Sequence, residues 1–190
     1  PQELNPLIYS NQQLLYDAMY HCVSATIEKL TSDTKHLGAK VGYICVLHTW
    51  GSEMNYHPHI HVILLGGGLT AKNQWRDKGE EFFLPVRVMS KLFRGKYLDI
   101  LKTLWNENKI QFHGSSEKYR NRYAFKELLN ICYRKDWVPH CKKTFNGAQS
   151  VINYLGKYTH RIAISNHRII RMDKDTVTYY VKDYREEGRW

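Results

Sequence analysis

The sequence predicts an α+β fold in which a central antiparallel β-sheet is flanked by helices. Three observations predict it: two apolar runs separated by a short polar segment, several stretches with helical apolar spacing, and no regular alternation of strand and helix. The chain of 190 residues is long enough to bury an adequate core. We therefore expect a single domain over residues 1–190, with residues 1–35 as an N-terminal helical segment packed on it.

The first part of the chain carries one predicted helix followed by two predicted strands. Apolar residues at helical spacing predict a helix over residues 11–30. Residues 41–50 and 57–65 are runs of β-forming residues, and the polar segment 51–56 between them predicts a hairpin connection. Gly66-Gly67-Gly68 is expected to end the second strand as a turn or a site of close approach, because no helix with a phosphate-binding lysine follows it.

The rest of the chain mixes helical and extended segments. Residues 82–88 resemble a short edge strand, because they contain Pro85. Tyr97 and Trp105 share the apolar spacing of the helix that follows and are expected to be structural. The other predicted elements are helices over residues 90–105, 117–133 and 147–160, an extended segment over 137–145, and short strands over 161–165, 168–172 and 176–181.

The two predicted strands carry three histidines. His59 and His61 lie two residues apart, so they project from the same face of a strand. If the two strands pair antiparallel, His48 stands opposite His59 on that face. Two imidazoles on a stiff strand make half of a metal site. The pattern therefore predicts that three histidines converge on one point.

A pair of tyrosines forms a second cluster in the predicted helix over residues 147–160. Tyr154 and Tyr158 are four residues apart and so share one helix face, with Lys157 beside them. On spacing alone such a pair also fits helix packing. A phenol has a pKa of about 10, so at neutral pH it is a poor nucleophile. It becomes a good one where positive charge or a metal favours the phenolate. Together with the histidines and the charge of the chain, the pair indicates attack of tyrosine on a DNA phosphodiester.

The charge of the chain indicates a polyanionic partner. The formal net charge is +10, and residues 134–171 hold eight Lys or Arg residues against one acid. A surplus of this kind on a compact domain favours nucleic acid, and the fourteen tyrosines and five tryptophans suit stacking on unpaired bases. The candidates for contacts to the DNA backbone are Lys142, Lys143, Arg161 and Arg168.

The sequence also indicates where the protein works. Its four cysteines form no C-x-x-C pair, which favours reduced thiols. The chain opens without a signal-peptide pattern, and it has no stretch of about 20 apolar residues that could cross a membrane. We expect a soluble cytoplasmic protein that does not associate with membranes. The oligomeric state stays open.

These motifs resemble those of a known family. His59-Ile60-His61 resembles the His-hydrophobic-His signature of the HUH endonucleases, and residues 154–158 (YLGKY) are similar to the paired-tyrosine motif of their two-tyrosine branch. Longer strings resemble the rolling-circle transposases of the IS-ninety-one type, in a match that runs over most of the chain. Those strings are LHTWG (47–51), HPHIH (57–61), GGG (66–68) and YLGKYTHRIAISN (154–166).

The resemblance implies a fold, a reaction and a cofactor. It implies an RRM-like or palm-like HUH catalytic domain in which the tyrosine helix faces the metal site. Such enzymes nick single-stranded or hairpin DNA at transposon ends, become linked to the 5′ phosphate through a tyrosine, and join the strand to target DNA. The first nucleophile would be Tyr154 or Tyr158, with Lys157 stabilising phenolate or phosphate. The setting would be the bacterial cytoplasm, in association with the nucleoid.

The resemblance also implies a single divalent cation, Mg²⁺ or Mn²⁺. His59 and His61 would hold it, with His48 as third ligand and Glu53 as the competitor for that position. The family commonly carries a cysteine-rich zinc module, and this chain has no cysteine array. Other readings remain open: a replication initiator or relaxase with the same chemistry, a non-catalytic DNA-binding module with a structural zinc site, and a metal-dependent hydrolase that activates water.

Overall fold

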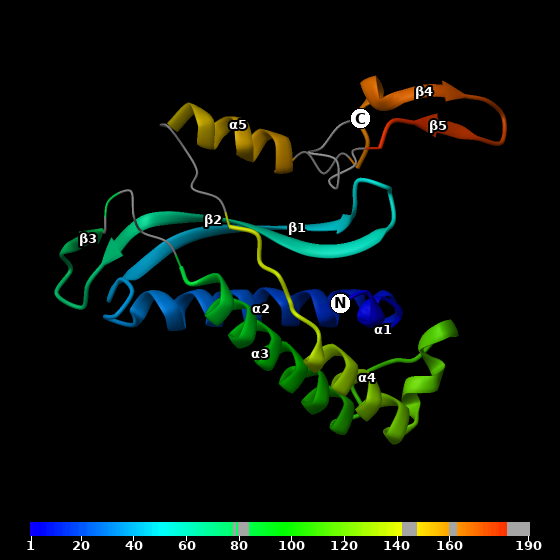
Figure 1. Ribbon diagram of the computed structural model, residues 1–190, viewed down its shortest axis with the longest axis horizontal. Coiled ribbons are helices and arrows are strands. Elements are labelled where there is room, and N and C mark those ends of the chain that lie inside the picture. Colours follow the sequence, from blue (N-terminus) through cyan, green and yellow to red (C-terminus); the bar gives the residue numbers. More distant parts are fainter. Residues whose placement is uncertain (78, 80–83, 142–147, 160–162, 182–190) are drawn as a thin grey trace. The chain divides into compact units, whose positions relative to one another are not determined.

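A computed structural model describes the chain except residues 78, 80–83, 142–147, 160–162 and 182–190 (Figure 1). The chain divides into two compact units. Unit 1 comprises Pro1–Cys45 and Val62–Thr144, and unit 2 comprises Val46–His61 and Phe145–Trp190. The expectation of a single catalytic domain over the whole chain stays a prediction.

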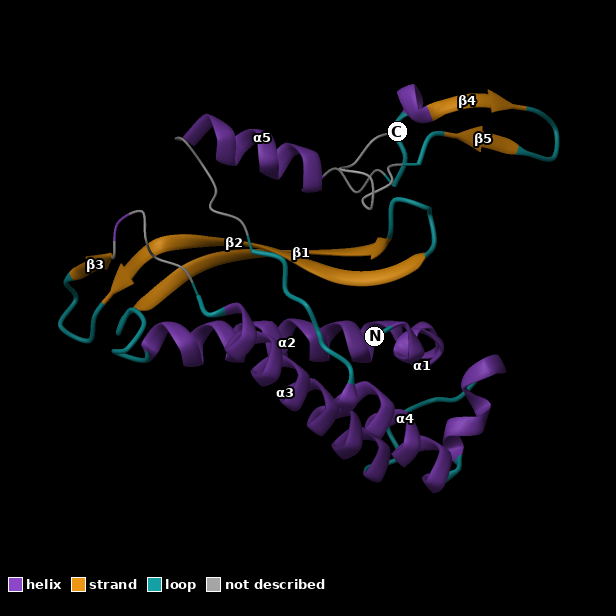
Figure 2. Cartoon of the chain, in the orientation of Figure 1, coloured by secondary structure: helices purple, strands orange, loops and turns teal. Residues whose placement is uncertain are grey.

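The predicted α+β class is confirmed, with a three-stranded sheet in the order β1-β2-β3 (Figure 2). Strand β1 spans Lys40–Trp50, β2 spans Tyr56–Leu69 and β3 spans Trp75–Asp77. A five-residue connection joins β1 to β2, as the sequence predicts, and Gly51 N–H donates to the carbonyl of Asn55 within it. Such a short connection makes the two strands antiparallel neighbours, and β3 pairs antiparallel with the end of β2.

The glycine triplet does not end β2, which continues through it to Leu69. The predicted turn is therefore wrong, while the predicted close approach is confirmed. A Cβ on Gly67 would lie 2.8 Å from the carbonyl oxygen of Arg76, and one on Gly68 would lie 2.7 Å from the carbonyl carbon of Lys40. Because glycine has no Cβ, neighbouring backbones can pass this close to the strand.

The part of the sheet that belongs to unit 1 packs on a long N-terminal helix. After the short helices η1 (Gln2–Leu4) and α1 (Asn5–Ser10), helix α2 spans Gln12–Ser32, which confirms the predicted helix. Figure 1 shows α2 lying along the parts of β1 and β2 that belong to unit 1. The core cluster between them consists of Ile27, Leu37, Ala39 and Val41, with Val23, Tyr43, Val62 and Leu64 packed against it.

Helix α3 spans Val86–Asn106 and lies against α2. Its Tyr97 is 2% exposed and donates its hydroxyl to the carbonyl of Leu15, which confirms the structural role predicted for it. The predicted edge strand is wrong for Val86–Val88, which are helical, while residues 82–83 lie outside the described residues. Pro85 occupies the N-cap position of this helix with a φ of −67°, and its fixed φ suits a helix start.

The helix predicted over residues 117–133 is divided in two. The 3-10 helix η3 spans Gly114–Arg120, and helix α4 spans Arg122–Arg134. Asn121 separates them, because its Oδ1 accepts the backbone N–H groups of Tyr123 at 2.8 Å and Ala124 at 3.2 Å. This side-chain cap satisfies two amides that a helix start leaves without partners.

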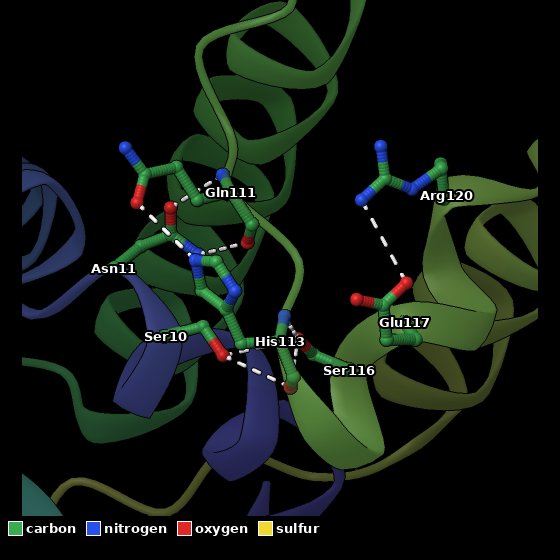
Figure 3. A network of polar contacts seen from close by, with 7 residues as sticks. All are labelled: Ser10, Asn11, Gln111, His113, Ser116, Glu117 and Arg120. Atoms are coloured by element: carbon green, nitrogen blue, oxygen red, sulfur yellow. Dashed lines mark hydrogen bonds and ion pairs between the residues drawn. The ribbon is translucent and has the colours of Figure 1, made fainter.

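A polar network ties η3 to the junction of α1 and α2 (Figure 3). The Asn11 side chain donates to the carbonyl of Gln111 and accepts its backbone N–H, both at 2.7 Å. The hydroxyls of Ser10 and Ser116 lie 3.0 Å apart. Because Asn11 is only 8% exposed and Ser116 is 0% exposed, these bonds satisfy groups that burial would otherwise leave unpaired.

Unit 2 holds the remaining described elements. Helix α5 spans Ala148–Thr159, as predicted, and the 3-10 helix η4 spans Asn166–Arg168. Strands β4 (Ile169–Met172) and β5 (Val177–Tyr179) pair antiparallel, which confirms two of the predicted short strands. The predicted strand over 161–165 is wrong for residues 163–165, which belong to no strand, and residues 161–162 are outside the described part.

Two further sequence predictions concern reduced cysteines and membrane-spanning segments. All four cysteines are free. Among the described residues, no helix is both long enough and apolar enough to span a membrane. Residues 137–141 of the predicted extended segment have no regular secondary structure, and residues 142–145 are not described.

Candidate metal and tyrosine site

The β1–β2 hairpin brings three histidines of unit 2 together. The ring nitrogens that His48, His59 and His61 offer all lie within 4.8 Å of one another. His48 comes from β1, and the other two come from β2 on alternate positions of the same face. His48 is 8% exposed, while the other two rings are half-buried. The convergence predicted from strand periodicity is therefore present in the structure.

Hydrogen bonds define which nitrogens face the centre of the cluster. His59 Nδ1 lies 2.7 Å from the carbonyl oxygen of His57, and because a carbonyl only accepts, Nδ1 is the protonated nitrogen. His59 Nε2 therefore carries a lone pair, which can accept a hydrogen bond or bind a metal ion, and that atom lies 3.0 Å from His61 Nε2. Backbone contacts that set the tautomer and ring orientation in this way are typical of metal-binding histidines.

The third ring is held by stacking. The His48 ring stacks on Trp50, with centroids 5.0 Å apart and planes at 12°. It also meets the edges of His61 at 4.6 Å and His59 at 5.6 Å. The sequence interpretation overlooked Trp50, although its position two residues after His48 places both side chains on the same strand face.

Burial favours the neutral imidazole in two rings of the cluster, His59 and His61. Burial lowers the pKa of His61 to about 4, with smaller contributions from His59 and His48, and burial also lowers the pKa of His59. Neutral imidazole is the form that binds metal ions. The donor set therefore fits a divalent cation. Three imidazoles also suit Zn²⁺, so the ligands alone do not select the ion.

Glu53, the alternative third ligand, lies in the turn between β1 and β2. Its backbone carbonyl accepts the hydroxyl of Tyr179 at 3.1 Å. Among the described residues, the cluster of potential ligands consists of the three histidines and does not include Glu53.

Helix α5 brings Tyr154 to this cluster. The Tyr154 hydroxyl lies 3.3 Å from His61 Nδ1, and the two ring centroids are 6.5 Å apart. His61 thus has Nε2 toward the other histidines and Nδ1 toward the tyrosine. If Nε2 is a ligand, the proton of the neutral ring sits on Nδ1 and is donated to the phenolic oxygen.

The other predicted tyrosine-helix residues are described only in part. Tyr158 and Lys157 belong to the backbone of α5, about one turn beyond Tyr154, and their side chains are outside the described part of the chain. Of the residues predicted to contact DNA, Lys142, Lys143 and Arg161 lie outside the described residues.

Arg168 joins the β4–β5 hairpin to the turn that follows β1. Its Nη2 donates to the carbonyl of Ser52 at 2.7 Å, and its Nε donates to the carbonyl of Tyr180 at 2.9 Å. The guanidinium also lies 5.9 Å from the ring centre of Tyr179. These contacts give Arg168 a structural position next to the histidine hairpin. Its predicted contact with DNA stays a prediction.

An antiparallel sheet that presents three histidines, with a tyrosine helix beside them, is compatible with an HUH-type site. Residues 42–190 match the family described as "Putative transposase", and the chain belongs to that family. The relationship to rolling-circle transposases predicted from the motifs is thereby confirmed at the level of the family.

Two curated relatives agree with this assignment. The chain is 37% identical over 190 residues to "Putative transposase y4qJ" of Sinorhizobium fredii, covering 100% of this chain and 48% of that protein. It is 26% identical over 189 residues to "Transposase for insertion sequence element IS801" of Pseudomonas savastanoi pv. phaseolicola, covering 99% and 44%. The chain thus spans less than half the length of these relatives. No solved structure gave a significant match.

Proposed function

We propose that this chain performs metal-dependent nicking and strand transfer of single-stranded DNA through a covalent 5′-phosphotyrosine, in rolling-circle transposition. The observation that carries the proposal is the contact of the Tyr154 hydroxyl with His61, 3.3 Å from Nδ1. It joins a candidate nucleophile to a cluster of candidate metal ligands. Membership of a transposase family and the net charge of +10 support it from independent directions.

The histidines would hold the cation. His48, His59 and His61 offer ring nitrogens to a divalent ion, for which we propose Mg²⁺ or Mn²⁺, with Glu53 as the alternative to His48. When bound, such an ion polarises a phosphoryl oxygen and offsets the charge that develops on the leaving oxygen. The carbonyl of His57 keeps His59 in the tautomer that this role requires.

Tyr154 would supply the nucleophile. His61 Nδ1–H orients the phenolic oxygen, which attacks the phosphorus in line with the bond to the 3′ oxygen. The new bond joins Tyr154 to the phosphate at the 5′ end of the downstream strand. The P–O3′ bond breaks, the 3′ oxygen takes up a proton to become a hydroxyl, and the phenolic proton goes to solvent.

The second half of the reaction would use the neighbouring turn of α5. Tyr158, four residues further along the helix, would carry out the matching cleavage or strand transfer. Lys157 would stabilise phenolate or phosphate charge. The proposed substrates are single-stranded or hairpin DNA at transposon ends and the target DNA, in the bacterial nucleoid. The proposed contacts to the DNA backbone come from Lys142, Lys143, Arg161 and Arg168.

The test is to trap the covalent intermediate. The protein is incubated with Mn²⁺ and end-labelled single-stranded DNA from a transposon end, and the products are separated on a denaturing gel. We expect a protein–DNA adduct that EDTA abolishes. Tyr154→Phe should lose it, while Tyr180→Phe, a matched change at a tyrosine that is 51% exposed in the same unit, should keep it.

The outcomes separate the competing functions. An adduct that survives Tyr154→Phe and is lost in Tyr158→Phe would reverse the order of the two nucleophiles. Cleavage without an adduct would indicate that water is the nucleophile and would refute the tyrosine mechanism. DNA binding without cleavage, unchanged in Tyr154→Phe and dependent on His59, would indicate a binding module with a structural metal. An initiator or relaxase would give the same adduct on a replication or transfer origin instead of a transposon end.

A further inference from the structure

Helix α4 of unit 1 exposes a group of basic and aromatic side chains that the proposed mechanism does not use. We call it the α4 face; its members are Arg122, Tyr123, Lys126, Tyr133 and Arg134, and all of them are exposed. Tyr123 is 82% exposed and Tyr133 is 60% exposed, although tyrosine normally covers its ring in the core or in an interface.

The spacing of these residues arranges them along one side of the helix. Arg122 and Lys126 are four residues apart and so lie one above the other, and Tyr133 follows seven residues after Lys126 on the same stripe. Tyr123 flanks that stripe. At about 1.5 Å rise per residue, the two tyrosines lie about 15 Å apart along the helix axis, with Lys126 between them.

The charges of the α4 face are not neutralised within the described part of the chain. None of the ion pairs found there involves Arg122, Lys126 or Arg134. Helix α4 contains one acidic residue, Glu127, which is exposed. A polyanion therefore meets three cations on this helix for each carboxylate.

The scaffold beneath the α4 face is firmly packed. Phe125, Leu128 and Cys132 anchor the opposite side of α4 and are at most 4% exposed. The Arg94 guanidinium lies 4.7 Å from the centre of the Tyr133 ring, and its Nη1 donates to the carbonyl of Lys135. Because the Arg94 guanidinium lies against one face of the Tyr133 ring, the ring is already oriented and loses little conformational entropy when it binds a ligand.

We propose that the α4 face binds a single strand of DNA, with the cations on phosphates and the two tyrosines stacked on bases. Cations supply affinity for any nucleic acid backbone. Exposed aromatic rings add affinity only where bases are unpaired, because the bases of a duplex are already stacked on one another. The proposal rests on the proposed function for DNA as the partner, and it adds a surface outside the histidine–tyrosine site that holds the strand.

The test measures affinity for DNA without any need for a cognate sequence. Fluorescence anisotropy with labelled oligothymidylate and with a duplex of equal length gives dissociation constants at several salt concentrations. For Tyr123→Ala with Tyr133→Ala we expect at least a fivefold weaker affinity for the single strand, from the known contribution of stacking of about 1–3 kcal/mol per base, and little change for the duplex.

Charge variants test the second half of the proposal. Arg122→Ala with Lys126→Ala should lower the slope of log affinity against log salt by about 0.7 for each single-strand phosphate that the protein no longer neutralises. Lys29→Ala with Lys72→Ala removes the same charge from exposed positions outside α4 and serves as the control. Because all these side chains are exposed, thermal melting should show that each variant is folded.

The possible outcomes are decisive. Unchanged affinity of the tyrosine variant for oligothymidylate, or equal losses in the α4 and control charge variants, would overturn the proposal, as would absence of binding at low salt. Equal weakening for duplex and single strand would assign the surface to duplex DNA instead. Binding of oligothymidylate that depends on the α4 tyrosines, in a protein that forms no covalent adduct, would refute the proposed nicking and would leave the α4 proposal standing, so the two failures can be told apart.

Discussion

Replacing Gly68 by alanine should destabilise unit 1 far more than the same change at Gly66. A Cβ on Gly68 would overlap the carbonyl oxygen of Lys40, would lie 2.7 Å from the carbonyl carbon of that residue and would lie 3.1 Å from Val41 Cγ1. A Cβ on Gly66 meets nothing within 4 Å. Both glycines belong to β2, and neither has a positive φ, so the difference reports close approach alone.

The size of the effect follows from the overlap. Carbon atoms in contact prefer separations of about 3.5–4.0 Å, so β1 and β2 would have to separate by about 1 Å at Gly68. Overpacking of this kind costs about 1–3 kcal/mol, and the upper end is expected because the obstacle is backbone. In a chain of this size, a loss of about 3 kcal/mol corresponds to a fall in Tm of about 6–12 °C. Gly66→Ala should be neutral or should stabilise by about 0.4–1 kcal/mol, because alanine restricts the unfolded chain.

The assay is thermal unfolding followed by circular dichroism, with urea unfolding as a second measure. Both variants should keep the far-ultraviolet spectrum of the wild type at low temperature. If Gly68→Ala and Gly66→Ala melt at the same temperature, the backbone of Lys40 does not approach Gly68 as closely as described, and the explanation of the glycine triplet is wrong.

Two further predictions concern unit 2 and the buried thiols. Arg168→Ala should lower the free energy of unfolding, measured in urea, by about 1–3 kcal/mol, because two backbone carbonyls lose their donor. If urea unfolding is unchanged and the salt dependence of DNA binding weakens, Arg168 contacts a phosphate instead. Burial raises the pKa of Cys22 and of Cys132 to about 11 in the folded protein. The same thiols ionise near pH of about 8.5 in the unfolded chain, so the free energy of unfolding falls as the pH rises from there to the folded pKa. Urea unfolding at several pH values above about 8.5 tests this. The free energy of unfolding of a Cys22→Ala and Cys132→Ala double variant should fall less steeply with pH than that of the wild type. Equal slopes against pH would contradict the burial of these thiols.

Most elements follow from local patterns. The helical spacing of apolar residues predicts α2, α3 and α5, because one face of each helix must be buried. The periodicity of two predicts that His59 and His61 share a face, because strand geometry alone decides it. The errors arose where a local signal allowed two structures. Pro85 suits both an edge strand and a helix start, and the glycine triplet suits both a turn and a tightly packed strand.

The sequence by itself determined most of the elements, the pair of histidines on one strand face, the surplus of positive charge and the resemblance to a transposase family. Only the tertiary structure showed that Tyr154 contacts the histidine cluster, since Tyr154 and His61 are 93 residues apart. It also decided that Arg168 holds the carbonyl of Ser52, 116 residues away. Periodicity describes which way a side chain points from its own element, whereas contacts between distant elements depend on how their buried faces pack, and no local pattern encodes that.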